Sequence, residues 1–165
     1  MAALAYNRAM EQVAKIQPFE RAERPCPACP LVFVDTNVIL GYIQGDPAAT
    51  QLFSVEAEGR IRFAVNGIVL QEILLTKDAA GGPEFQNVID HLRVLPIDMA
   101  KAEALVPRAQ ALRNRMPHSN DLLILSSADE CDFLVTSDVR LKDLVAADKP
   151  QIVTPEELVA QLKAA

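Results

Sequence analysis

The sequence lacks the features that mark membrane, secreted and disulfide-rich proteins. No apolar run approaches the roughly 18 residues of a membrane-spanning helix. The start, MAALAYNRAMEQ, has neither the basic region nor the clean apolar stretch of a signal peptide. The three cysteines are an odd number and cannot form a disulfide framework. We therefore expect a reduced, cytoplasmic protein with no membrane segment.

An excess of positive charge is also missing. The 22 acidic residues outnumber the 16 basic ones and give a formal charge of −6. Proteins that coat nucleic acids bind through Lys and Arg against phosphate, so this class is disfavoured. Two routes to a polyanion stay open: a local basic rim can outweigh the global charge, or bound divalent cations can invert the sign at one site.

What the sequence does contain fits one folded domain behind an arm. Its 165 residues, half of them apolar, can bury a core that hides roughly two-thirds of the unfolded surface. Apolar spacing predicts a helix over 2–17, and the prolines of RPCPACP (24–30) predict a semi-rigid linker. We divide the chain into an N-terminal helical arm with a Pro-rich linker, 1–30, and a domain, 31–165.

Within the domain, short apolar strands alternate with helices, which implies a parallel sheet with helices on both faces. We expect strands at 31–34, 61–65, 93–97, 133–136 and 151–154. We expect helices at 37–42, 46–58, from Asn66 onward, 84–92, 98–115, 120–131, 138–145 and from Pro155 onward. The expected caps are Asp46, Asn66, Asp98 and Ser119, the last of these directly before its helix. Pro107 should kink or split its helix, and the apolar residues of the Asn66 helix that should face inward are Ile68, Val69, Ile73 and Leu74.

Acidic residues follow the most apolar strands. Asp35 comes directly after LVFV (31–34), and Asp138 comes two residues after FLVT (133–136). Ligands bind parallel sheets at the carboxyl ends of the strands, so both carboxylates are expected at that edge. Asp121 opens the helix before the second of these strands, and Glu72 lies in an apolar helix. The four acids are therefore candidates for one site.

Each acid also has an ordinary explanation. Asp35 and Asp138 could simply cap helices, Asp121 could complement a helix dipole, and Glu72 could be a solvated helix residue. Together, however, converging carboxylates would repel one another and have raised pKa values. A hard divalent cation such as Mg²⁺ or Mn²⁺ would resolve that repulsion, because it prefers oxygen ligands.

The ordered set of segments resembles a PIN-domain nuclease. Among such nucleases it resembles in particular the PIN-domain toxins of VapBC toxin–antitoxin systems. It comprises VFVDTNVIL (32–40), the Glu in an apolar helix, NDLLILSSA (120–128) and LVTSD (134–138). The resemblance covers residues 31–154. It implies a three-layer α/β/α sandwich on a mostly parallel sheet of about five strands, with strands one and four central. The N-terminal helix would be an addition to that fold.

The resemblance also implies an activity: a Mg²⁺- or Mn²⁺-dependent endoribonuclease, usually homodimeric, with an antitoxin that would present Arg or Lys to the acidic cluster. Metal would lower the pKa of a water that attacks phosphorus, so no nucleophilic side chain is needed. The implied metal ligands and catalytic residues are Asp35, Glu72, Asp121 and Asp138. The residues expected to support them are Thr36, Asn37, Thr136 and Ser137. The candidate phosphate-binding residues are Lys77, Arg113, Arg115, Arg140 and Lys142.

Other interpretations remain at this stage. A non-catalytic PIN-like binding module, or a PIN nuclease in RNA processing rather than a toxin, would share these segments. A phosphatase of the haloacid dehalogenase type would need an aspartate where Asn37 stands. Cys26 and Cys29 have the spacing of half a zinc site, but the other half is missing, so ordinary linker thiols are favoured. The arm is expected to pack on its own domain.

Overall fold

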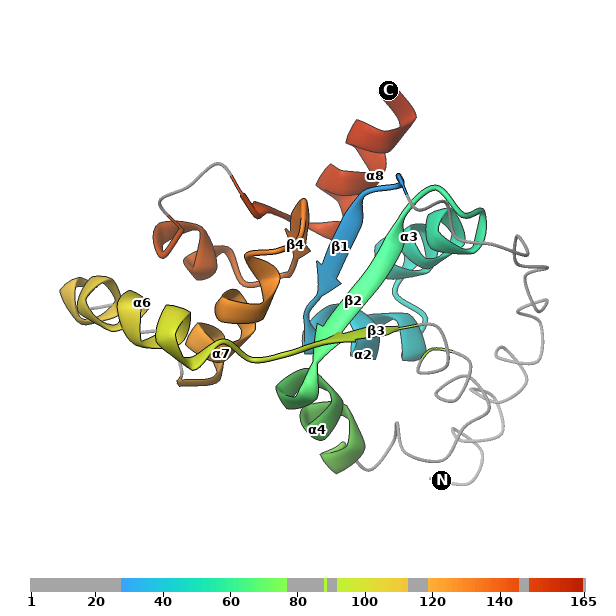
Figure 1. Cartoon of the computed structure of the whole chain (residues 1–165). Helices are drawn as coiled ribbons and strands as arrows, with labels where there is room; N and C mark the ends of the chain where they lie inside the picture. The colour runs from blue at the N-terminus through green and yellow to red at the C-terminus, as the bar shows by residue number, and fades with distance from the viewer. Residues whose placement is uncertain (1–27, 77–87, 89–91, 113–118, 146–148, 165) are drawn as a thin grey trace.

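The computed structural model describes residues 28–76, 88, 92–112, 119–145 and 149–164 (Figure 1). Its strands form one five-stranded sheet in the order β3-β2-β1-β4-β5, and every neighbouring pair is parallel. The strands are β1 (Leu31–Val34), β2 (Arg62–Asn66), β3 (Arg93–Leu95), β4 (Phe133–Val135) and β5 (Gln151–Val153). The described helices are α2 (Thr36–Ile43), α3 (Pro47–Ala57), α4 (Gly67–Leu75), α6 (Met99–Ala111), α7 (Ser119–Ala128), the 3₁₀ helix η1 (Val139–Asp143) and α8 (Pro155–Ala164). The expected parallel α/β sheet, with strands one and four adjacent in its middle, is confirmed.

Some expectations concern residues outside this description. The arm over 2–17 lies outside it, as does the 84–92 helix apart from Val88 and Leu92. The domain division at residue 30 therefore stays a prediction. None of the helices in the described ranges is long and apolar enough to cross a membrane.

The central strands bring distant parts of the chain to one edge. All of β1 is buried, as expected for an apolar run covered on both faces. The register sets Val34 of β1 opposite Val135 of β4. The strand order reverses between these two strands, since β2 lies on the other side of β1. The residues after Val34 and Val135 therefore emerge together at a topological switch point.

Helices cover both faces of the sheet (Figure 1). Right-handed crossovers place α2 and α3 on one face and α6 and α7 on the other, and α8 joins the first group by packing on α3. Phe53 of α3 stacks on Tyr42 of α2 with ring centroids 4.1 Å apart, and meets Phe63 of β2 edge-on at 4.8 Å. These aromatic contacts fix the helical layer against the sheet. The helix α4 contacts α2 of one helical layer and α7 of the other. It therefore connects the two layers at the end of the sheet that is lowest in Figure 1.

At the amino edge of the sheet, opposite to the switch point, one carboxylate bonds to a strand and to a lysine. Asp132 Oδ2 accepts a 2.9 Å hydrogen bond from the backbone N–H of Leu31, and Lys149 Nζ lies 2.6 Å from Asp132 Oδ1. These contacts hold the pKa of Asp132 below its ordinary value, chiefly through Lys149.

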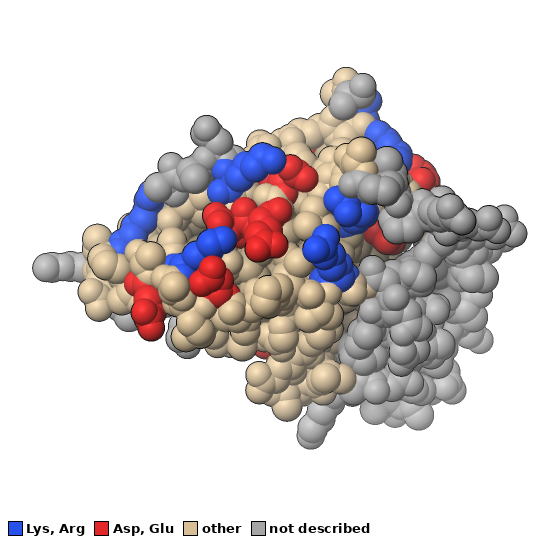
Figure 2. Space-filling view, in the orientation of Figure 1, with Lys and Arg blue, Asp and Glu red and all other residues tan. Residues whose placement is uncertain are grey.

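Figure 2 shows acidic and basic side chains interleaved over the face where α7 and β4 lie. Much of the negative charge there is therefore locally compensated.

The expected starts of α3, α6 and α8 are confirmed. Asp46 caps α3, with Pro47 at its first position, by accepting from Ala49 N–H at 2.8 Å. Asp98 caps α6 through Lys101 N–H. The start of α8 is a reciprocal pair, in which Glu157 accepts from Thr154 N–H at 2.8 Å and Thr154 Oγ1 accepts from Glu157 N–H at 3.2 Å.

Three local expectations need correction. The helix α6 ends at Ala111 rather than near residue 115, because Leu112 leaves helical geometry at ψ 46°. Pro107 lies inside this continuous helix and does not split it, and the other expected effect, a kink, stays a prediction. Ser119 is the first residue of α7 and not its preceding cap.

A fourth correction concerns α4. Leu74 was expected on the inner face but is 56% exposed, beside Leu75 at 74%. Val69 and Ile73 are fully buried. Ile73, Leu74 and Leu75 all belong to the last turn of α4, so this turn packs one side on the core through Ile73 and exposes the other side through Leu74 and Leu75.

Candidate active site

Asp35 is the centre of the candidate site at the carboxyl edge of the sheet, directly after β1. Its side chain is almost fully buried, with 7% of the residue exposed. Oδ1 accepts from Thr36 N–H at 2.7 Å. Oδ2 accepts from Asn37 Nδ2 at 2.8 Å and from Thr136 Oγ1 at 2.6 Å. Asp35 is thus the cap of α2, as its ordinary explanation supposed, and also the hub of a polar network between β1 and β4.

Glu72 is tied to Asp35 through Thr36. The Thr36 hydroxyl donates a hydrogen bond to Glu72 Oε2, and Thr36 N–H donates to Asp35. The other oxygen, Glu72 Oε1, accepts from Asn120 Nδ2 at 2.8 Å. Asn120 precedes Asp121 on α7, so these bonds place α4 beside the start of α7. The structure therefore brings Glu72 into the neighbourhood of Asp35, 37 residues earlier in the chain.

Asp138 is tied to Asp35 through Thr136. Thr136 Oγ1 donates to Asp35 and accepts from Asp138 N–H at 2.9 Å. Asn37 supports the same turn, because its Oδ1 accepts from Ser137 N–H at 3.2 Å. The Asp138 side chain caps η1 and is paired with the Arg140 guanidinium, which lies 2.8 Å from Oδ1 and 2.9 Å from Oδ2 through Nε. Asp138 is therefore close to Asp35 but turned toward a cation.

Electrostatics place Asp121 in the same group. The pKa of Asp35 is raised above its ordinary value, first by burial and then by the charges of Glu72 and Asp121. Hydrogen bonds from Thr136 and Thr36 partly offset the rise. The charge of Asp121 also raises the pKa of Arg140. The raised pKa expected from crowded carboxylates is present at Asp35, although burial contributes more to it than repulsion.

The donor set suits a hard cation. Each carboxylate oxygen has about two lone pairs that can accept a hydrogen bond or bind an ion. The described hydrogen bonds use one lone pair on each of three oxygens, namely Asp35 Oδ1, Glu72 Oε1 and Glu72 Oε2. A second lone pair on each of these oxygens can therefore bind an ion. Carboxylate oxygens are the ligands that Mg²⁺ and Mn²⁺ prefer. Within the described residues, no three His, Cys, Asp or Glu side chains already converge as a metal-holding group. An ion that took Asp138 as a ligand would have to replace the Arg140 guanidinium at this carboxylate.

Two positioning residues were missed, wholly or in part, by sequence reasoning. Asn66 was expected only as a cap, and it does cap α4 through Ile68 and Val69 N–H, both at 3.1 Å. It also donates to Leu123 O at 3.1 Å and Ser127 Oγ at 3.0 Å on α7. Asn120 was not singled out at all. A buried amide beside a strand end was the available signal for Asn66; nothing local marks Asn120.

The candidate phosphate-binding residues have separate outcomes. Arg140 is engaged by Asp138, and Lys142 lies 3.4 Å from Glu157 Oε2 on α8. Lys77, Arg113 and Arg115 lie outside the described residues. The role of all five in binding RNA stays a prediction.

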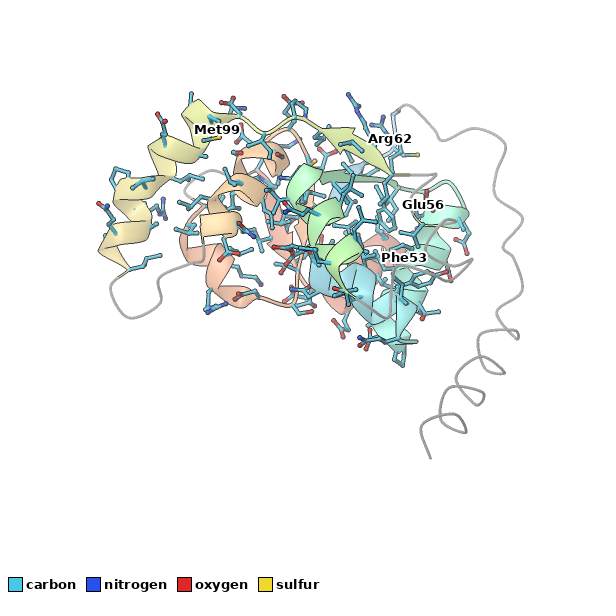
Figure 3. The ribbon with its side chains drawn as sticks, turned by 90° about the horizontal axis from the view of Figure 1, so that it is seen from below. Phe53, Glu56, Arg62 and Met99 are labelled. Carbon is cyan, nitrogen blue, oxygen red and sulfur yellow. The ribbon has the colours of Figure 1, made fainter. Side chains whose placement is uncertain are left out.

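The described linker cysteine has a structural contact. Cys29 Sγ lies 3.2 Å from Gly59 O, and the Cys29 carbonyl accepts from the Arg62 guanidinium at 3.1 and 3.0 Å. Arg62 is labelled in Figure 3, where it lies at the far side of the molecule from Met99 of α6. Cys26 lies outside the described residues, so the zinc alternative is not tested.

Comparisons with known proteins agree with this geometry. A search of curated proteins gave no match. Among solved structures, the chain is similar in fold to one described as VapBC2 from Rickettsia felis bound to a DNA fragment from their promoter. The two share 18% sequence identity with a TM-score of 0.52, over 75% of this chain and 98% of that one.

The sequence comparison identifies the family. The match to the PIN domain spans residues 32–147, which is more than half of the chain and contains all four candidate acids. It begins in β1 and ends after η1, so it covers the strands that form the switch point. The resemblance inferred from the sequence is thereby confirmed, and this chain belongs to the PIN domain family.

Proposed function

We propose that this chain is a Mg²⁺- or Mn²⁺-dependent endoribonuclease that hydrolyses RNA phosphodiester bonds, and that it is the VapC-type toxin of a toxin–antitoxin pair. One observation carries the proposal. Asp35 is linked to Glu72 through Thr36 and to Asp138 through Thr136 at the switch point of the sheet. PIN domains are generally nucleases, and the hydrogen bonds that link Asp35 to Glu72 and Asp138 support this proposal.

The chain's own residues have distinct tasks in this proposal. The residues that would hold the ion are Asp35, Glu72, Asp121 and Asp138. Thr36, Asn37 and Thr136 orient the Asp35 and Glu72 carboxylates by hydrogen bonds to specific oxygens, and Asn37 also holds the turn at Ser137. When bound, a divalent cation supplies a lowered water pKa and positive charge against the phosphate. Because Asp35 is buried, bulk water competes less with an ion for its carboxylate oxygens.

Charge supports a metal-dependent route. The net charge of −6 opposes contact with RNA, and the acidic cluster is a local concentration of that charge. Divalent ions would invert the local sign and let a phosphate approach. The basic candidates Arg140 and Lys142 lie on η1, directly after Asp138, and would add to this attraction.

An antitoxin is the proposed protein partner. The similar solved structure is described as a VapBC2 complex on promoter DNA. In this chain, α4 carries Glu72 and also exposes Leu74 and Leu75, an apolar surface that a partner segment would cover. A homodimer and a cytoplasmic location complete the proposal.

A cleavage assay tests the function. The full chain is incubated with a mixed structured RNA in EDTA, Mg²⁺ or Mn²⁺, with Asp35→Asn alongside. We expect cutting that requires metal and is lost in D35N, whose fold is checked by circular dichroism. Cutting by D35N at the parent rate would contradict the assignment. An absence of both cutting and metal binding would favour the non-catalytic binding module, and a cutting protein whose gene has no small antitoxin gene beside it would favour a nuclease of RNA processing.

A further inference from the structure

We propose that Arg140 is an internal counter-cation which occupies Asp138 in the metal-free protein, competes with the divalent ion for this carboxylate, and so sets the metal affinity of the site. The inference rests on the proposed function, because it takes Asp138 as a metal ligand. It adds a role for a residue that sequence reasoning placed only among phosphate contacts.

The contact between the two side chains is bidentate. Arg140 Nε lies 2.8 Å from Asp138 Oδ1 and 2.9 Å from Oδ2, and Nη2 also contacts Oδ2. Arg140 N–H donates to Oδ1 at 3.0 Å. Both carboxylate oxygens thus face donors from a residue only two positions away. Such a guanidinium–carboxylate fork is a strong, directional form of ion pair.

The neighbouring acids are held differently. Among the residues that the structure describes, the donors to Asp35 and Glu72 are backbone N–H, hydroxyl and amide groups, all neutral. Neutral donors orient a carboxylate and leave its charge available to a metal. The guanidinium at Asp138 instead supplies the positive charge itself. Unlike Asp35 and Glu72, Asp138 is therefore a ligand at which a metal must displace a cation.

The guanidinium acts on more than one acid. The charge of Asp121 reaches Arg140, whose pKa it raises together with Asp138. Arg140 therefore offsets part of the carboxylate repulsion that crowding creates. A divalent ion bound among these acids would repel the guanidinium and supply the same compensation. Metal and Arg140 are thus alternative counter-charges for one cluster.

Lys142 provides a matched control on the same short helix. It is 41% exposed in its side chain, close to the 44% of Arg140, but its Nζ lies near Glu157 and not near Asp138. Removing Lys142 changes the net charge of η1 by the same unit. A difference between the two variants therefore reports the specific contact and not the loss of a positive charge.

Calorimetric titration of Mn²⁺ into the full chain tests the inference. We expect Arg140→Gln to bind Mn²⁺ about three- to tenfold more tightly than the parent, as the loss of a partly exposed bidentate pair suggests. Arg140→Lys, which cannot form the fork, should be intermediate, and Lys142→Gln should match the parent. Equal or weaker binding by R140Q, with the parent binding normally, would overturn the inference alone.

Thermal unfolding gives a second readout that does not depend on RNA. In EDTA, R140Q should unfold at a lower temperature than K142Q, because its carboxylates are uncompensated. The rise in Tm on adding Mn²⁺ should be larger for R140Q than for K142Q. Equal rises would overturn the inference. If neither the parent nor any of the variants binds Mn²⁺, the proposed function fails and this inference fails with it.

Discussion

Asp35 accepts a 2.6 Å hydrogen bond from Thr136, a residue 101 positions later in the chain. The bond joins the ends of β1 and β4, the two strands between which the sheet order reverses. The same hydroxyl accepts from Asp138 N–H at 2.9 Å. One buried oxygen therefore sets the positions of two acidic residues at once.

Thr136→Val should weaken the site without removing any acid. The valine keeps the branched shape but leaves Asp35 Oδ2 and Asp138 N–H each without this partner. We expect a loss of about 1–3 kcal/mol in stability, because Thr136 is 1% exposed. Cleavage should fall roughly 10- to 100-fold through misplacement of the carboxylates. Denaturant unfolding and initial cleavage rates measure the two effects; Thr136→Ser, which keeps the hydroxyl, should recover most of the activity.

Asp35→Asn should change how stability depends on pH. Burial raises the pKa of Asp35 above 3.8 in the folded protein. A raised pKa means that the stability contributed by this carboxyl is present below about pH 3.8 and is lost as pH rises through the folded-state pKa. In EDTA, the Tm of D35N minus that of the parent should therefore increase from about pH 4 toward neutral pH. A difference that stays constant with pH would contradict the raised pKa.

Asn66→Ala should destabilise the fold and misplace two site helices. The substitution removes the α4 cap, worth roughly 0.5–2 kcal/mol. It also leaves Leu123 O and Ser127 Oγ without the amide donor, worth about 1–3 kcal/mol when buried. We expect a total loss of about 2–4 kcal/mol, measured by urea unfolding. Asn66→Ser, which can keep the cap but not the contacts to α7, separates the two contributions; a loss in N66S as large as that in N66A would mean that the cap contributes nothing, and no loss in N66S would mean that the α7 contacts contribute nothing.

Asn120→Ala should act through Glu72 alone. Glu72 Oε1 loses its 2.8 Å donor but keeps the Thr36 hydroxyl on its other oxygen. Because Asn120 is only half-buried, stability should fall by no more than about 1 kcal/mol. Cleavage should fall about tenfold, with the larger effect at low Mn²⁺ concentration. Recovery at high Mn²⁺ would locate the defect in ion binding, whereas an unchanged metal dependence would argue against a role for Glu72.

The sequence predicted the acidic network through the strands that carry it. Asp35 and Asp138 follow apolar runs, and parallel strands place such residues at one edge regardless of their distance along the chain. Asp121 was included because its helix leads into the second of those strands, and Glu72 because it lies in the helix that follows the strand expected at 61–65. Asn66 was recognised as a cap, since that signal is local.

The remaining features depend on tertiary packing that no local pattern carries. The donation from Asn66 to α7 requires knowing that α4 and α7 lie together. Leu74 is exposed although Ile73 in the same turn is buried, so the boundary of the buried face of α4 depends on its packing partners, which helical spacing alone does not give. The direction of the Arg140 side chain is set by the turn after Asp138, and a basic residue near an acidic cluster could equally have faced solvent.

The most direct test of the central claim is an analysis of the RNA ends left by the full chain in Mn²⁺. Water-driven hydrolysis at an acidic metal site leaves linear phosphate monoesters and free hydroxyl ends. The account predicts such ends in Mn²⁺, no cutting in EDTA, and no cutting by D35N. Cyclic 2′,3′-phosphate ends that persist in EDTA would mean that the RNA's own 2′-hydroxyl is the nucleophile, and they would contradict a metal-dependent site at Asp35.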